Sequence, residues 1–270
     1  MRAPSRSLVS RASTAVALLL AVACSRQVAV APAPEVAAPA PRPDGRTVIR
    51  AMHDRYAGKW YMSLSFKQNT VFISQSGRET KQVWNEYIVL PGRLRIDYLP
   101  LSSRSGVLYS DGKMYSFTNG KQQPPQPGWN PLLTLMGDVY TQLPDTTAWQ
   151  LDSLGFDLSV ARRDTVEGKE MWVVGAPKGD STTSQFWVDT DSLLVRRIVH
   201  HDTRAARPVV NETRFQNYRN VSGFPVAFAM RFYRDGRLYF KEDYFSVKAG
   251  ETLSVELFEP DNWVKSQLKR

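Results

Sequence analysis

The sequence predicts an α+β fold that is mainly β: an incomplete antiparallel β-barrel, or half-barrel, of about eleven strands, with short helices capping its open concave side. Three observations predict this class. Apolar and polar residues alternate through most of the chain after Lys59. Turn dipeptides such as Asp111-Gly112 and Asn119-Gly120 recur at short intervals. No regular succession of strand, helix and strand occurs, so neighbouring strands should run antiparallel.

The composition is that of a protein with a buried core. The 270 residues are 42% hydrophobic and 23% charged, close to the averages of soluble globular proteins, which excludes wholesale disorder and a protein with many membrane spans. The formal net charge of +9 favours contact with anionic lipid headgroups, although an ordinary solvated basic face explains it equally well. No basic cluster interleaved with stacking aromatics occurs, so no nucleic-acid partner is predicted.

The N-terminus is predicted to direct export. Residues 1–23 are a predicted signal peptide, in which three arginines precede an apolar run, Ala12 to Ala23, that is too short to span a bilayer. Cys24, the single cysteine, directly follows this run, and the junction resembles a bacterial lipoprotein signal. We therefore expect Cys24 to be lipidated and to anchor the protein to a membrane. The alternative is secretion to the periplasm after cleavage near Ala23.

The remainder divides into a tether and one domain. Residues 24–45 comprise the cysteine and an extended segment rich in Pro and Ala. Residues 46–270 form the predicted half-barrel domain. Ser25, rather than an acidic residue, follows the cysteine, so the expected location is the periplasmic face of the outer membrane.

One helix is expected at the start of the domain, with Asp44 as its N-cap and Gly58 at its end. Its predicted buried face consists of Val48, Ile49, Met52 and Tyr56.

The first strands are expected to form the wall of a hydrophobic cavity. Alternate residues of a strand face the same side, so the apolar set should point inward, leaving Arg93, Arg95 and Asp97 on the convex, wetter face. A sheet of this many twisted strands curls, and an apolar hollow is a site for hydrophobic ligands. The alternative is that these side chains simply fill the core. The predicted wall residues are Trp60, Met62, Leu64, Phe66, Leu94, Ile96 and Tyr98.

A short helix is predicted to begin at Asn130-Pro131, since proline suits the first turn of a helix. This helix is apolar on most sides, which is unusual at a protein surface, so we expect it to cover the mouth of the cavity as a mobile lid. The alternative is an ordinary core helix. The predicted lid residues are Leu132, Leu133, Leu135 and Met136.

The second half of the chain is expected to return to strands. A further short helix is predicted near Asp145–Leu151, and strand patterns resume after Phe156. Two long, aromatic-rich strands are predicted at Val226–Tyr233 and Leu238–Val247.

Several segments, in this order and spacing, resemble the LolA/LolB superfamily of periplasmic lipoprotein carriers and receptors over about residues 46–260. The segments that carry the resemblance are Ser65-Phe66-Lys67-Gln68, the run from Pro91-Gly92 to Tyr98, the runs Tyr109–Lys113 and Met114–Phe117, Asn130-Pro131-Leu132-Leu133 with Trp149 after it, Phe186–Asp191 ahead of Leu194–Val199, and Leu257-Phe258-Glu259-Pro260.

The resemblance implies a half-barrel whose cavity holds the acyl chains of lipoproteins or other lipids. It implies a membrane-anchored protein that takes up acyl chains and assists lipoprotein sorting or lipid transport to the outer membrane, with envelope proteins as further partners. One residue departs from the family pattern: the carrier has a basic residue before the proline that helps hold its lid shut, and this chain has Leu90 there. The alternative function is an envelope sensor or scaffold that uses the half-barrel for protein contacts and carries no lipid.

No catalytic, metal-binding or cofactor-binding residues are predicted, so the chain is not expected to be an enzyme. His200 and His201 are adjacent in a predicted strand and point to opposite faces, so they cannot jointly bind one metal ion, and a surface pair is expected. His53 lies on the polar side of the first helix. No nucleophile elbow, phosphate-binding loop, dinucleotide fingerprint or zinc-protease motif occurs.

Overall fold

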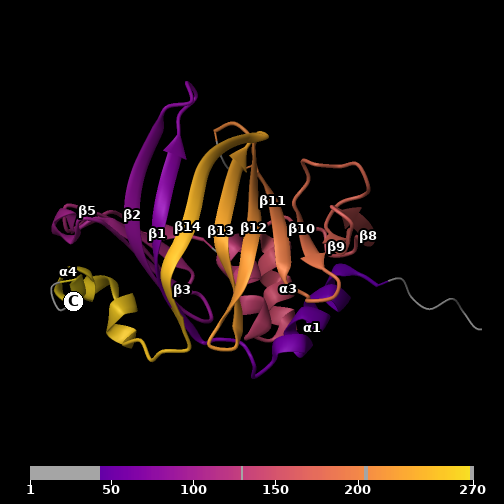
Figure 1. The fold of residues 1–270 in the computed structure, drawn as a ribbon, viewed down its shortest axis with the longest axis horizontal. Helices are drawn as coiled ribbons and strands as arrows, with labels where there is room; N and C mark the ends of the chain where they lie inside the picture. Colours follow the sequence, from indigo (N-terminus) through magenta and orange to yellow (C-terminus); the bar gives the residue numbers. More distant parts are fainter. Residues whose placement is uncertain (1–42, 129, 204–205, 268–270) are drawn as a thin grey trace, which may run out of the picture. The chain divides into compact units, whose positions relative to one another are not determined.

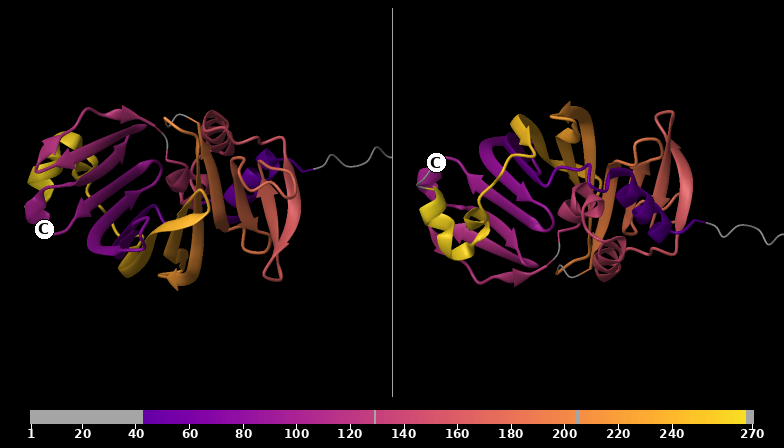
Figure 2. Two further views of the ribbon diagram at one scale, coloured as in Figure 1. Left: turned by 90° about the horizontal axis from the view of Figure 1, so that it is seen from above. Right: turned by 90° about the horizontal axis from the view of Figure 1, so that it is seen from below.

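The computed structural model describes residues 43–128, 130–203 and 206–267, which build a single antiparallel sheet that does not close into a barrel. The predicted half-barrel is therefore confirmed (Figures 1 and 2). Cys24 and the segment predicted to form a tether lie outside the described residues. No helix in the described ranges is long and apolar enough to cross a membrane.

Over the described residues the sheet has fourteen strands rather than about eleven. The strands β6 and β7 contain two residues each, too few to show an alternating pattern. In chain order the strands are β1 (Ser63–Ile73), β2 (Glu79–Val89), β3 (Arg93–Tyr98), β4 (Gly106–Ser110), β5 (Lys113–Thr118), β6 (Lys121–Gln122), β7 (Gln126–Pro127), β8 (Ala161–Val166), β9 (Lys169–Val174), β10 (Gln185–Asp189), β11 (Val195–Asp202), β12 (Val209–Val221), β13 (Phe224–Arg234) and β14 (Arg237–Ala249).

Apart from β7, strands that are neighbours in the sheet are also consecutive in the chain, except where β1 lies next to β14. The order across the sheet is β6-β5-β4-β3-β2-β1-β14-β13-β12-β11-β10-β9-β8, and β7 pairs with β5. The first strand therefore pairs with the last, which joins the two halves of the sheet at its centre (Figure 1). The predicted hairpin turns are confirmed: Asp111-Gly112 joins β4 to β5 and Asn119-Gly120 joins β5 to β6, with positive φ at all four residues.

Three helices pack on the concave side of the sheet, namely α1 (Gly45–Tyr56), α2 (Pro131–Met136) and α3 (Pro144–Ser153). The predicted N-cap of α1 is confirmed: Asp44 Oδ1 accepts a hydrogen bond from the Thr47 amide at 2.8 Å. The predicted start of α2 at Asn130-Pro131 is confirmed as well, and Asn130 Oδ1 caps this helix by accepting a hydrogen bond from the Leu132 amide at 3.0 Å. The expected face of α1 is buried in the main core.

Tyrosine hydroxyls attach these helices to the sheet. The hydroxyl of Tyr56, at the end of α1, donates to the Ser192 carbonyl at 2.7 Å. The hydroxyl of Tyr140, in the 3-10 helix η2 (Asp138–Tyr140), donates to the Leu193 carbonyl at 3.1 Å. Both carbonyls lie just before β11, so the helical layer is held at a defined position on the concave face.

The convex face of β3 is covered by the C-terminal segment, which contains the 3-10 helices η3 (Val255–Phe258) and η4 (Pro260–Asn262) and the helix α4 (Trp263–Gln267). A further 3-10 helix, η1 (Leu101–Ser103), directly follows β3. Arg95 and Asp97 are on the predicted face, but the expectation that this face is wetter is wrong for them, since both are 0% exposed. The Arg95 guanidinium lies 3.0 Å from the Asp97 carboxylate and 4.1 Å from the centre of the Trp263 ring.

A glycine permits this close packing. A Cβ atom at Gly106 of β4 would lie 2.7 Å from the Trp263 ring, so only glycine leaves room for the ring there. The C-terminal segment thus buries a charged pair that the local sequence pattern assigns to the surface.

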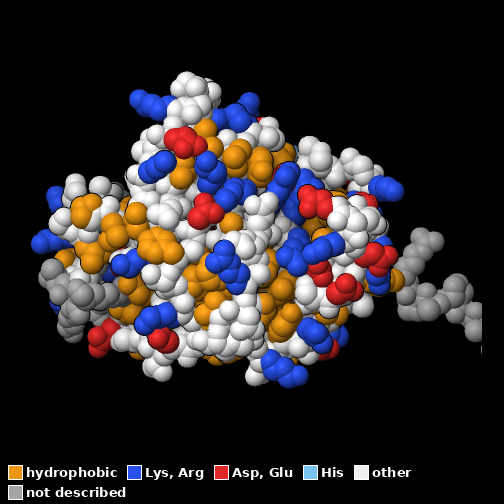
Figure 3. Space-filling view, viewed as in Figure 1, with side chains coloured by type: hydrophobic (Ala, Val, Ile, Leu, Met, Phe, Trp, Pro, Cys, Tyr) orange, Lys and Arg blue, Asp and Glu red, His pale blue; other side chains and the backbone are white. Residues whose placement is uncertain are grey.

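One face of the molecule shows how the basic side chains are distributed. On the face seen in Figure 3, Lys and Arg lie among acidic and hydrophobic side chains instead of forming one patch.

Candidate functional site

A hollow of about 270 Å³ lies on the concave side, between the sheet and α2. Its wall comes from β2, β3, β4, β5, β13 and β14, and its lining is mostly apolar and aromatic. A hollow of this size is close to the lower end of the range for small-molecule sites.

Strand register explains which side chains reach the hollow. Ile96 of β3 lies opposite Glu86 of β2, and Leu94 of β3 lies opposite both Ile88 of β2 and Tyr109 of β4. Residues directly opposite each other in an antiparallel pair share a face, so one inward row continues from strand to strand.

The structure places part of the predicted wall in this hollow. Leu94, Ile96 and Tyr98 line it. Leu64 and Phe66 face the same side of the sheet but are 1% and 3% exposed and belong to the main core, where Phe66 stacks on Tyr244 at 4.0 Å. They support the wall without lining the hollow.

Trp60 and Met62 are not wall residues, because β1 begins only at Ser63 and strand alternation does not apply before it. Trp60 is buried against Tyr140, with their ring centres 4.0 Å apart. Met62 is 53% exposed, so its predicted inward position is wrong.

The predicted lid residues divide between two faces of α2. Leu132, Leu133 and Met136 line the hollow, as their helical spacing allows. Leu135 is 0% exposed and belongs to the main core, so its assignment to the lid surface is wrong. A helix packed on two sides is apolar on most sides, which is why the sequence could not separate the two roles.

Two contacts hold the C-terminal end of α2 to the β2–β3 turn. The Gly92 amide donates to Asp138 Oδ1 at 2.9 Å. The Leu90 side chain packs on the backbone of Gly137, where an added Cβ would lie 2.6 Å from a Leu90 methyl carbon. Leu90 thus makes an apolar contact at the position where the resemblance implies a basic residue.

The hollow also contains two carboxyl groups that the sequence analysis did not single out. Glu86 of β2 and Glu242 of β14 line it and are 5% and 6% exposed. The sequence held a signal: Glu86 stands between inward-facing Trp84 and Ile88, so alternation turns its carboxyl inward.

Burial governs the protonation of these carboxyl groups. Burial and the neighbouring Glu242 carboxyl raise the pKa of Glu86, and burial raises the pKa of Glu242. The Tyr244 hydroxyl donates to Glu242 Oε2 at 3.0 Å.

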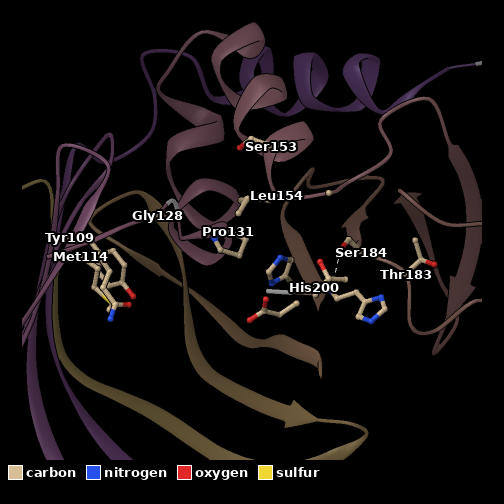
Figure 4. A pocket seen from close by; sticks show the side chains of 14 residues that line it. Tyr109, Met114, Gly128, Pro131, Ser153, Leu154, Thr183, Ser184 and His200 are labelled. Carbon is tan, nitrogen blue, oxygen red and sulfur yellow. Dashed lines mark hydrogen bonds between the residues drawn. The ribbon is translucent and has the colours of Figure 1, made fainter. Parts of the chain in front are cut away.

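A second hollow, of about 660 Å³, adjoins the first at Tyr109 and Met114. Figure 4 shows these two side chains at one side of it, Pro131 and Leu154 above, and His200 and Ser184 opposite. The concave face therefore offers neighbouring spaces on both sides of the start of α2.

His200 and His201 both border this second hollow and are partly exposed. The His200 ring lies nearly parallel to Phe156 at 6.1 Å. The described residues contain no group of three or more His, Cys, Asp or Glu side chains arranged to hold a metal ion. His53 contacts the Asp54 carboxylate at 3.0 Å on α1.

Comparison with known proteins places the fold. No protein-family model matches the chain, and no curated protein matches it in sequence. Solved structures match over most of their length, among them a LolA superfamily protein from Nitrosomonas europaea, with a TM-score of 0.52, 12% identity, and coverage of 81% of this chain and 98% of that one.

The fold is LolA-like. An outer membrane lipoprotein-sorting protein domain from Vibrio parahaemolyticus matches with a TM-score of 0.54, 10% identity, and coverage of 82% and 98%. A DUF1329 family protein from Desulfovibrio piger matches with a TM-score of 0.54, 16% identity, and coverage of 80% and 95%. At these identities the likeness concerns the LolA-like fold alone.

Proposed function

We propose that this protein is a membrane-anchored lipid-binding protein of the periplasm that takes up acyl chains in its concave hollow and assists lipoprotein sorting or lipid transport to the outer membrane. One observation carries the proposal: an apolar hollow lies beneath a helix whose Leu132, Leu133 and Met136 also face it. Burying an apolar chain there removes its surface from water, which is the main driving force for such binding.

The LolA-like fold supports acyl chains as the proposed ligand. One matching structure is named as an outer membrane lipoprotein-sorting domain. The anchor is proposed from the sequence, through acylation of Cys24 at the end of the predicted signal peptide, and stable attachment needs more than one membrane-binding element.

Lipid occupancy is tested on the purified protein by native mass spectrometry and by titration with a fluorescent fatty acid. We expect bound lipid, and affinities that rise about fourfold for each added methylene until the hollow is full, as burial of about 0.8 kcal/mol per methylene requires. If the purified protein carries no lipid, and if its affinity for added fatty acids does not depend on their chain length, the sensor or scaffold alternative is supported instead.

The wall is tested with a matched pair of variants. Ile96→Asp places a charge in the hollow, and Asn69→Asp places one on the exposed side of β1. We expect only the first to lose the fluorescent fatty acid. Equal losses contradict the proposed binding face.

The anchor is tested separately by labelling with radioactive palmitate. We expect label in the unaltered protein and none in Cys24→Ala, together with release of the variant from the membrane fraction. An unlabelled native protein, or an unchanged location of the variant, contradicts lipidation.

A further inference from the structure

Two acidic side chains lie among the residues that line the hollow. Glu86 and Glu242 lie on the two strands that flank β1, and both face the hollow. None of the described residues that line this hollow is Lys, Arg or His. Burying carboxyl groups among apolar side chains is costly unless something compensates them.

The cluster around these carboxyl groups also has fewer hydrogen-bond donors than acceptors. The Tyr244 hydroxyl and the Gln68 amide both act as hydrogen-bond donors toward Glu242, and Gln68 Nε2 also donates to Thr70 Oγ1 at 2.9 Å. Within the described residues, no side-chain donor reaches the Glu86 carboxyl, which is 5% exposed and lines the hollow. Gln68 Oε1 is also buried without a partner, but Gln68 does not line the hollow. The site therefore has acceptors for a ligand that brings several donors.

Aromatic rings stand beside the same carboxyl groups. The ring centre of Trp84, two residues before Glu86 on the same face, lies 4.7 Å from that of Tyr98 and 5.8 Å from that of Phe240. All three rings line the hollow. Aromatic faces attract cations, and walls of this kind are used to recognise ammonium groups.

We propose that the hollow selects amphiphiles whose polar end is a protonated amine, with Glu86 and Glu242 receiving the ammonium group and the aromatic wall covering the hydrocarbon next to it. An ammonium group has three donors and no acceptor, which matches the shortage of donors in this cluster. The inference rests on the proposed function, because it assigns the class of ligand to the same hollow. A fatty-acid carboxylate is disfavoured by repulsion between like charges.

Protonation makes this selectivity depend on pH. The raised pKa values of Glu86 and Glu242 mean that acidification neutralises the pair before ordinary surface carboxylates, and attraction for an ammonium is then lost. From the opposite side of the sheet, Arg231 opposes and Asp243 reinforces the pKa shift of Glu242. Helix α2 contributes no titratable group. The hydroxyls that face the pair belong to Tyr98, Tyr109, Tyr239 and Tyr244.

The experiment compares three probes with the same hydrocarbon: dodecylamine, dodecan-1-ol and dodecanoate. Each is titrated, below its micelle concentration, against the purified full chain by calorimetry. At about pH 8 we expect dodecylamine to bind at least tenfold more tightly than dodecan-1-ol, and dodecanoate more weakly than either. At about pH 5 the preference for the amine should shrink, because the carboxyl pair takes up protons while the amine stays charged.

Glu86→Gln is the decisive variant, because it keeps the shape of the side chain and removes its charge. We expect it to lose most of the amine preference while it still binds dodecan-1-ol. Its control is Glu79→Gln, the same change in β2 on the opposite, exposed face, which should bind all three probes as the native protein does.

The outcomes separate the two proposals. If dodecanoate binds as tightly as dodecylamine, or if Glu86→Gln keeps the amine preference, the amine assignment is wrong while acyl-chain binding stands. If none of the three probes binds, the proposed function itself fails, and the ligand class fails with it.

Discussion

The backbone amide of Gly92 donates a hydrogen bond to the Asp138 carboxylate at 2.9 Å, and this contact ties the β2–β3 turn to the segment that follows α2. Asp138 is 2% exposed, so the contact is shielded from water. Together with the packing of Leu90 on Gly137, it provides an attachment for the covering helix that needs no ion pair.

The first prediction concerns pH. Burial raises the pKa of Asp138 to about 7, with the Gly92 amide acting in the opposite direction. Between about pH 4 and pH 7 the folded state therefore holds a proton that the unfolded chain has released, so the free energy of unfolding should fall as the pH rises through this range.

Asp138→Asn keeps an oxygen acceptor for Gly92 and cannot ionise. We expect the variant to reduce the total fall in unfolding free energy over this pH range by on the order of 1–4 kcal/mol. Some pH dependence should remain, because the raised pKa values of Glu86 and Glu242 act in the same direction. Urea unfolding of both proteins at several pH values measures the slopes. Identical slopes would show that Asp138 does not titrate in this range.

The second prediction concerns the Leu90 contact. In Gly137→Ala the new methyl group collides with Leu90, and we expect the free energy of unfolding to fall by about 1–3 kcal/mol. In a Leu90→Ala background the collision is absent, so the same change should cost much less. A double-mutant cycle by denaturant unfolding measures the difference, and additive effects would mean that the two residues do not interact.

The third prediction separates the two faces of α2. Leu135→Asp buries a charge in the main core and should prevent folding, seen as the loss of a cooperative thermal transition. Met136→Asp changes the face toward the hollow, so we expect a normal transition and weak binding of a fluorescent fatty acid. A folded Leu135→Asp protein that binds lipid normally is incompatible with this arrangement.

The fourth prediction concerns the buried ion pair on the opposite face. Asp97→Ala leaves the Arg95 guanidinium buried without its carboxylate, and we expect a loss of about 3–5 kcal/mol of unfolding free energy. Arg95 also holds the C-terminal segment through the carbonyls of Leu257 and Trp263, so Arg95→Met should speed proteolysis of that segment. Unchanged protease resistance would show that the segment docks without Arg95.

Local features of this protein follow from the sequence because their causes lie within a few residues. The caps at Asp44 and Asn130 depend on a side chain and an amide nearby in the chain. The hairpin at Asp111-Gly112 depends on residues that tolerate positive φ. The inward row of Leu94, Ile96 and Tyr98 depends only on the period of a strand.

The predicted side-chain positions agree with the structure where a single strand decided them and disagree where packing decided them, while the lipid-binding role of these residues stays a prediction. Met62 follows the alternating pattern, yet it precedes β1 and its side chain is exposed. Leu135 has the same character as Leu133, and both pack in the main core, yet only Leu133 also lines the hollow. Neither outcome is visible without knowing where the sheet starts and which elements flank the helix.

By itself, the sequence determined the class of fold, the N-cap of the first helix, the hairpin turns and the inward face of β3, because these follow from local backbone geometry. Only the tertiary structure decided what lies against each face. Arg95 and Asp97 are buried because the C-terminal segment, more than 150 residues later, covers them. Glu86 and Glu242 share one hollow because β1 pairs with β2 on one side and with β14 on the other, and such pairing depends on the summed packing of the whole sheet.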